Sequence, residues 1–206
     1  MYKRQNVKRL TIGGGLDTQP DWSPDGTKIA FVSFRDGLPH IYVMNADGTD
    51  QVRLTEGFMD HWAPAWSPDG TKIVYTAGNQ SDTDVYMMDV DGSNVVRITD
   101  DRDFEEDPVW SPDGTKIAFV SIGPGGGNTD IFVMDVDGSN KTAVTTHLSP
   151  DLFHAWSPDG SEIVFASPRD GSLELYVIGA DGANLRRLTD NAAKDGTPDW
   201  SIGSVP

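Results

Sequence analysis

Residues 20–33 read PDWSPDGTKIAFVS, and this stretch recurs with few changes along the chain. Successive copies are 44, 44, 46 and 44 residues apart, and the last copy breaks off after its first residues. A fixed period of this length is typical of an array of one repeated structural unit. The tryptophans that lead the copies are Trp22, Trp66, Trp110, Trp156 and Trp200.

Each copy predicts four short antiparallel strands, A to D. In the first copy, residues 28–33 and 41–44 alternate between two faces and are rich in β-branched and aromatic side chains. The turns contain Pro-Asp-Gly and Asp-Gly, in which glycine accepts a positive φ. No stretch has helical periodicity. Four strands in each repeat of about 44 residues predict an all-β fold, a β-propeller with one blade per repeat.

The pattern P-x-W-S-P-D-G-x-K-I-x-F-x-S, followed by I-Y-V-M-D-x-D-G-S-N and R-L-T, resembles the repeat of TolB-type β-propellers. This repeat is also called PD40 and is WD40-like. The resemblance covers nearly the whole chain. It implies a scaffold that binds proteins or peptides, in the periplasm or outside the cell. Some proteins with this repeat are polysaccharide lyases with a metal on the channel face, and others carry a peptidase domain after the propeller.

The repeat predicts a single domain over residues 1–206 with four complete blades. Both ends are left over, because residues 2–11 contain a strand-D sequence and residues 197–206 begin with a strand-A sequence. We expect the ends to pair as a reduced fifth blade in a monomer, although propellers with this repeat usually have six or more blades. The alternative is an open chain whose edges a second chain covers, which predicts a strand-sharing oligomer. The four complete blades are predicted at residues 20–55, 64–99, 108–145 and 154–189.

Composition limits the partners. Acidic residues number 32 against 16 basic ones, for a net charge of −16, so the surface repels phosphate backbones and predicts no nucleic-acid partner. No apolar run approaches the roughly 20 residues of a membrane helix. The first residues, MYKRQNVKRLT, show no apolar signal-peptide core. The chain has no cysteine, which excludes disulfides and thiolate metal sites.

Two faces of the propeller are expected to differ. The A–B and C–D turns share one face and are nearly uniform, which indicates a structural role. The B–C and D–A loops share the other face and differ between blades, and variable loops on a rigid scaffold are where recognition usually lies. We therefore place a ligand site on the second face, at the channel mouth. The predicted binding residues are Asp17, His61, Glu105, Glu106, Asp107, Asp151, His154 and Asp195.

Five of these residues stand at equivalent positions in the D–A loops, five residues before each tryptophan. Equivalent positions should lie at a similar distance from the axis, so a ring of carboxylates and histidine could hold Ca²⁺, Mg²⁺ or Mn²⁺. The alternative is a solvated channel lining, because no short-range ligand spacing supports a metal. The five metal candidates are Asp17, His61, Glu105, Asp151 and Asp195.

Three functions remain open at this point. We favour a non-catalytic binding module that requires no cofactor, because the chain lacks a G-x-S-x-G elbow, an H-E-x-x-H motif and a P-loop. The second is a metal-assisted lyase or hydrolase that uses His61 and His154 near the channel. The third is a repeat fragment whose only activity is self-assembly.

Overall fold

The computed structural model describes residues 7–79, 82–122, 127–191 and 193–200. These residues form strands and loops and no helix, so the predicted all-β class is confirmed. None of them forms a helix with the length and apolarity that a membrane crossing requires. The strands of the first two blades are β1 (Asp17–Trp22), β2 (Lys28–Ser33), β3 (His40–Asn45), β4 (Val52–Arg53), β5 (Asp60–Trp66), β6 (Lys72–Asn79), β7 (Asp82–Asp89) and β8 (Val96–Arg97). Those of the next two are β9 (Phe104–Trp110), β10 (Lys116–Ile122), β11 (Thr129–Asp135), β12 (Thr142–Ala143), β13 (Leu152–Trp156), β14 (Glu162–Ser167), β15 (Glu174–Gly179) and β16 (Arg186–Arg187).

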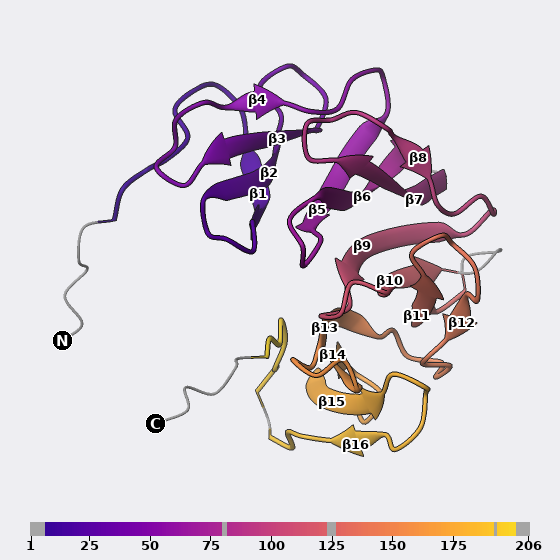
Figure 1. The fold of residues 1–206 in the computed structure, drawn as a ribbon. Coiled ribbons are helices and arrows are strands. Elements are labelled where there is room, and N and C mark those ends of the chain that lie inside the picture. The colour runs from indigo at the N-terminus through magenta and orange to yellow at the C-terminus, as the bar shows by residue number, and fades with distance from the viewer. Residues whose placement is uncertain (1–6, 80–81, 123–126, 192, 201–206) are drawn as a thin grey trace.

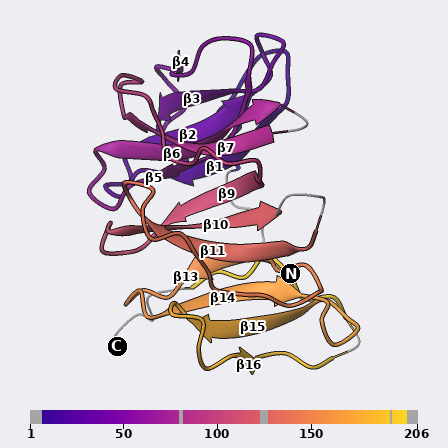
Figure 2. The ribbon, with the colours of Figure 1, turned by 90° about the vertical axis from the view of Figure 1, so that its right-hand side faces the viewer.

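The sixteen strands form four blades of four antiparallel strands around a common axis (Figure 1). Strands β1, β5, β9 and β13 lie innermost, and β4, β8, β12 and β16 lie on the outer rim (Figure 1). The blades follow one another in a curved array when seen from the side (Figure 2). A single parallel contact between Thr83 and Phe104 joins the second and third blades into one eight-stranded sheet. The arc is open between the first blade and the fourth (Figure 1).

Every inner strand contains a bulge. The pairing of β1 with β2 shifts register between Thr18 and Asp21, and the strands β5, β9 and β13 shift at the equivalent place. One residue in each bulge has a positive φ, which a bulge accommodates by bending the strand. The bulge interrupts the regular alternation of side chains along the strand, so the residues before it and after it do not follow one alternating pattern. The four residues are Gln19 (φ 48°), Ala63 (48°), Asp107 (51°) and Phe153 (56°).

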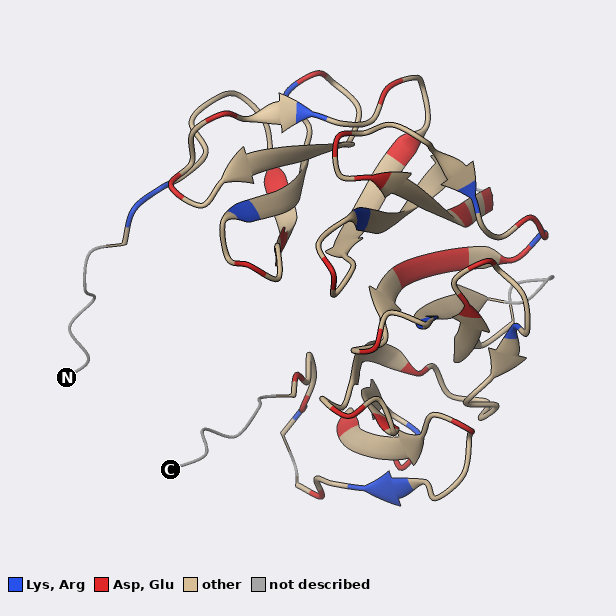
Figure 3. Ribbon diagram, in the orientation of Figure 1, with Lys and Arg blue, Asp and Glu red and all other residues tan. Residues whose placement is uncertain are grey.

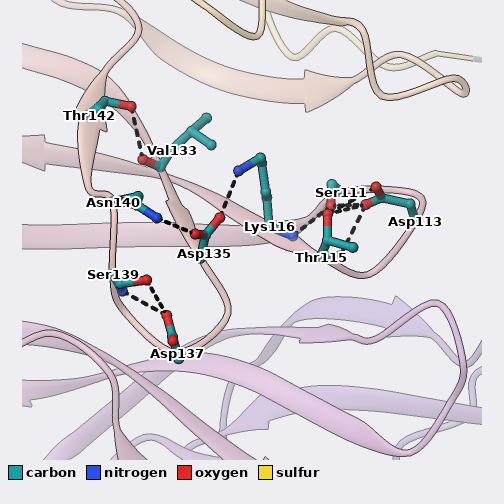
Figure 4. Close-up of polar contacts among 10 residues, drawn as sticks. All are labelled: Ser111, Asp113, Thr115, Lys116, Val133, Asp135, Asp137, Ser139, Asn140 and Thr142. Carbon is teal, nitrogen blue, oxygen red and sulfur yellow. Dashed lines mark hydrogen bonds and ion pairs between the residues drawn. The ribbon is translucent and has the colours of Figure 1, made fainter.

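The uniform turns are held by their own aspartates. In the third blade, the Asp113 carboxylate accepts hydrogen bonds from the Ser111 hydroxyl (2.6 Å) and the Thr115 backbone N–H (3.0 Å), as Figure 4 shows. In the next turn, Asp137 accepts from the Ser139 hydroxyl at 2.6 Å (Figure 4). The same contacts recur in the other blades, for example around Asp25 and Asp69. These aspartates therefore serve the turns, as their uniform sequence predicts.

The glycine of each C–D turn approaches the outer strand of the preceding blade. Gly138 has a φ of 85°, and a Cβ added there would lie 2.5 Å from the Ile98 carbonyl oxygen. A Cβ added at Gly92 would lie 2.9 Å from the Leu54 carbonyl oxygen, and one at Gly182 would lie 3.3 Å from that of Val144. Glycine at this turn therefore allows neighbouring blades to pack together.

We expect Gly138→Ala to destabilise the protein by more than about 1 kcal/mol, because alanine meets both an unfavourable φ and a backbone clash. Gly26→Ala is the matched control, since Gly26 also has a positive φ (67°) but no atom within 4 Å of its added Cβ. Urea unfolding of both variants measures the difference. Equal losses of stability would show that φ alone matters and that the contact between blades does not.

Three of the leading tryptophans, Trp66, Trp110 and Trp156, contact the preceding blade. Trp66 and Trp156 are only 8% exposed, and each joins a core cluster containing residues of the preceding blade. Trp110 is half-buried and donates its indole N–H to the Ala65 carbonyl of the preceding blade (3.2 Å). Trp22 has no complete blade before it and is 54% exposed. Burial of this residue type thus depends on a preceding blade.

Both ends of the chain carry local features of blade strands. Leu10 lies against Gly48 as Leu54 lies against Gly92, so residues 7–11 occupy the place of an outer strand before the first blade. At the other end, Thr197 has a φ of 51°, like the bulge residues. The Asp195 N–H donates to the Leu173 carbonyl (2.8 Å), as the equivalent His61 N–H donates to Pro39.

The two ends do not pair with each other in the described residues. No strand is assigned within residues 7–11 or 197–200, and Figure 1 places the segments on opposite sides of the opening. Residues 2–6 and 201–206 lie outside the described residues. The reduced fifth blade therefore stays a prediction, and the described chain forms an open arc.

Candidate functional site

A pocket of about 330 Å³ lies on the inner side of the arc, and we call it the inner pocket. Its lining comes from three successive blades, which meet only near the axis (Figure 1). Strand β9 carries the acidic stretch of this region (Figure 3). Two of the predicted binding residues, Glu106 and Asp107, are therefore part of a shared concave site. The lining residues are Gln19, Trp62, Thr76, Glu106 and Asp107.

The bulges shape the inner pocket. Gln19 and Asp107 are the positive-φ residues of β1 and β9, and both line the pocket. The Gln19 side-chain oxygen accepts a hydrogen bond from the N–H of Ala63, the bulge residue of β5 (3.0 Å). Trp62 is held by Phe34 of the first blade, with ring centroids 5.3 Å apart. These two contacts hold the rim of the inner pocket in place without a ligand.

The two acids of the inner pocket are electrostatically unsatisfied. Neither Glu106 nor Asp107 forms an ion pair within the described part of the chain. Burial raises the pKa of both carboxyl groups, and the charge of Asp107 adds to the rise at Glu106. A pair of carboxylates without cations in a concave surface attracts a positively charged group.

Three of the other predicted acids are occupied by cations of the chain itself. Glu105 and Asp151 are fully buried, and their carboxylates contact Lys141 Nζ (2.6 Å) and Arg169 Nη2 (2.7 Å). Asp17 is half-buried and lies 3.5 Å from Arg35. In each case the cation belongs to the blade that the acid's own strand opens. These acids therefore form ion pairs within their blades, while Glu105 Oε2 and Asp151 Oδ2 are buried without a hydrogen-bond partner in the described residues.

The remaining predicted residues have separate surroundings. His61 is 3% exposed and its ring lies 5.1 Å from that of His40. His154 is 7% exposed and takes the place that proline holds in the other copies. Burial lowers the pKa of each of these histidines to about 4, so both rings are neutral at pH 7. Asp195 is half-buried and accepts a hydrogen bond from the Asn191 amide (2.7 Å).

The structure does not gather the five D–A residues, which are four acids and one histidine, into one ring. Within the four described segments, no group of three or more His, Asp or Glu side chains is arranged to hold a metal ion. Equivalent sequence positions do lie at equivalent places in the blades, but Asp17, Glu105 and Asp151 each pair with a cation of their own blade. A divalent cation at the channel therefore stays a prediction from the sequence.

Sequence reasoning missed three residues of the inner pocket: Gln19, Trp62 and Thr76. Trp62 directly follows the predicted D–A residue His61, and Gln19 lies two residues after the predicted D–A residue Asp17. The missing information was the bulge, which places adjacent residues of one strand on the same site. A break in the alternation of apolar and polar residues before P-x-W, repeated from copy to copy, is a sequence signal for the bulge.

Comparisons with known proteins agree with this architecture. Residues 80–170 match the model of the Tricorn protease N-terminal beta propeller domain. A segment of 45 residues is 47% identical to the Tol-Pal system protein TolB of Bordetella pertussis, and it covers 22% of this chain and 10% of that protein.

Two solved structures are similar over most of this chain. The putative TolB from Agrobacterium tumefaciens has a TM-score of 0.73 at 27% identity, covering 82% of this chain and 63% of that one. TolB from Acinetobacter baumannii has a TM-score of 0.77 at 25% identity, covering 93% and 48%. The chain thus spans about half to two thirds of these proteins and a tenth of the curated relative.

Proposed function

We propose that this chain, which is similar to TolB-type β-propellers, is a non-catalytic scaffold that binds a protein or peptide in the inner pocket. The observation that carries the proposal is the unpaired carboxylates of Glu106 and Asp107 in a concave site built by three blades. We place the protein in the periplasm or outside the cell on the same similarity to TolB.

The inner pocket fits an extended segment with a basic side chain. Its acids supply charge, the Trp62 ring supplies an apolar wall, and the Gln19 and Thr76 side chains supply polar groups. A chain with a net charge of −16 also attracts a cationic partner over longer distances. Nucleic acid is disfavoured for the same reason. A metal-assisted lyase or hydrolase stays a hypothesis from the sequence, without a cluster of ligands in the described residues to favour it.

The proposal predicts that Glu106→Gln together with Asp107→Asn weakens binding of a basic peptide at least about fivefold. The probe is a fluorescein-labelled peptide of alternating lysine and alanine, and the measurement is fluorescence anisotropy at low and high salt. Removing both charges should also flatten the salt dependence, because that dependence arises from screened attraction.

A charge-matched control separates the pocket from the general acidity of the surface. Asp100→Asn with Asp190→Asn removes the same two charges from exposed loops, where these side chains are 84% and 86% exposed. This control should bind almost as the parent does. If the two double variants lose affinity equally, the inner pocket is not the binding site.

A further inference from the structure

Three blades share an arrangement that the inner pocket does not use: a cation lies over a pair of aromatic rings. In the first blade, the Arg35 guanidinium carbon is 5.6 Å from the Phe31 ring and 4.6 Å from the Tyr42 ring. The same guanidinium contacts the Ser33 hydroxyl (2.8 Å) and Asp17. The cation thus closes the gap between the aromatic pair and the loop that enters the blade.

The fourth and third blades repeat this closure. Arg169 lies 5.1 Å and 4.9 Å from the rings of Phe165 and Tyr176 and binds Asp151. In the third blade the cation is Lys141, which approaches from the outer strand and lies 5.4 Å from both Phe119 and Phe132. The cation therefore recurs even though two different chain positions supply it.

The second blade keeps the aromatic pair but has no cation of its own there. Tyr75 and Tyr86 stack with centroids 5.7 Å apart, and no Lys or Arg of the described residues lies over either ring. The residues equivalent to the cation and its anchors have all changed together. Relative to Asp151, Ser167, Arg169 and Lys141, this blade has His61, Ala77, Asn79 and Val95.

A cavity lies beside this aromatic pair. It measures about 560 Å³ and lies between the outer strand of the first blade and the tyrosines of the second; we call it the tyrosine pocket. The equivalent pocket before the fourth blade is lined by Arg169 and measures only about 280 Å³. The tyrosine pocket is lined by Arg53, Leu54, Thr55, Glu56, Met59, His61, Tyr75, Tyr86, Asp91, Gly92, Ser93 and Val95.

We propose that the tyrosine pocket binds the guanidinium group of an arginine side chain from a partner protein, in the position that Arg35 and Arg169 fill in their own blades. Stacked tyrosines attract a cation over their faces. A planar guanidinium covers both rings and still donates hydrogen bonds sideways. Glu56 and Asp91 add acidic side chains to the exposed rim.

His61 occupies the sequence position at which the first and fourth blades have Asp17 and Asp151. It lines the pocket, its ring is 5.9 Å from that of Tyr75, and its Nδ1 atom is buried with no hydrogen-bond partner in the described chain. The neutral ring can accept a hydrogen bond from a guanidinium N–H. Arg53 also lines the pocket, but Asp36 (3.3 Å) and His40 (2.9 Å) hold its guanidinium.

The test introduces a cation of the chain itself into the tyrosine pocket. Val95→Lys places a lysine where the third blade has Lys141, and Val95 is 53% exposed, so the change is tolerated sterically. The probe is N-acetyl-arginine methylamide, with the uncharged citrulline analogue as its control. Binding is followed by NMR of the Tyr75 and Tyr86 ring protons. We expect the arginine probe, and not the citrulline probe, to shift these signals, and Val95→Lys to weaken binding at least tenfold.

Matched variants make the outcome decisive. Val96→Lys adds the same charge one residue along the strand, where the side chain is 51% exposed, and should bind as the parent does. Tyr86→Phe should retain binding, whereas Tyr86→Leu should lose it. Equal effects of the two lysine variants, or equal shifts with both probes, would overturn the proposal. Glu106→Gln with Asp107→Asn should leave this binding unchanged, so the result is independent of the inner pocket.

Discussion

Replacing Trp66 by alanine is expected to lower the free energy of unfolding by about 3–5 kcal/mol. The indole is 8% exposed and packs in one cluster with Ala30 and Val43 of the first blade and Ile73 of the second. Its removal leaves a cavity at an interface between blades, where both surfaces are rigid sheets and collapse poorly. The lost contact therefore weakens each blade and also the joint between them.

Trp22→Ala is the internal control for this prediction. The two tryptophans lead equivalent copies, but Trp22 is 54% exposed because no complete blade precedes it. Its replacement should cost about 1 kcal/mol or less, in the range of exposed substitutions. Urea unfolding followed by tryptophan fluorescence and by circular dichroism measures both variants.

The contrast between the two variants tests how the fold is stabilised. In a repeat array, stability is approximately a sum of terms within units and terms between neighbouring units. Similar losses for Trp66→Ala and Trp22→Ala would show that the tryptophan acts within its own blade. A large loss for Trp66→Ala alone assigns the energy to the contact between blades.

The fold was predictable from sequence because several independent local signals in each repeat indicate the same structural unit. Turn residues such as those of Ser-Pro-Asp-Gly, the alternation of residues 28–33, and the tryptophan period all indicate the same four-stranded unit. The predicted strands 28–33 and 41–44 correspond to β2 and to most of β3.

The site was less predictable, because equivalence between repeats fixes a residue's place on a strand but not its partner. Glu105 and Asp151 were expected at the channel, yet their cations come from strand D in one blade and from the B–C loop in the other. No spacing in the sequence links Lys141 to Glu105. Glu106 and Asp107 line the inner pocket, next to the bulge of their strand, and their role in binding stays a prediction.

Replacing Asp151 by alanine is the second large prediction, with an expected loss of about 3–5 kcal/mol. The side chains of Asp151 and Arg169 are 0% and 8% exposed, and their nearest charged atoms are 2.7 Å apart. Without the carboxylate, the guanidinium stays over two aromatic rings and has lost its ion-pair partner. Breaking one partner of a buried pair is more harmful than removing both, since the remaining charge keeps its desolvation penalty.

Two comparisons separate this effect from a simple loss of contact. Asp100→Ala removes a carboxylate that is 84% exposed and 2.8 Å from Arg97, and it should cost no more than about 1 kcal/mol. The double variant Asp151→Ala with Arg169→Met should recover much of the stability lost by Asp151→Ala, because methionine covers the rings without a charge. If the double variant is no more stable than the single one, the carboxylate stabilises the blade by some means other than its charge.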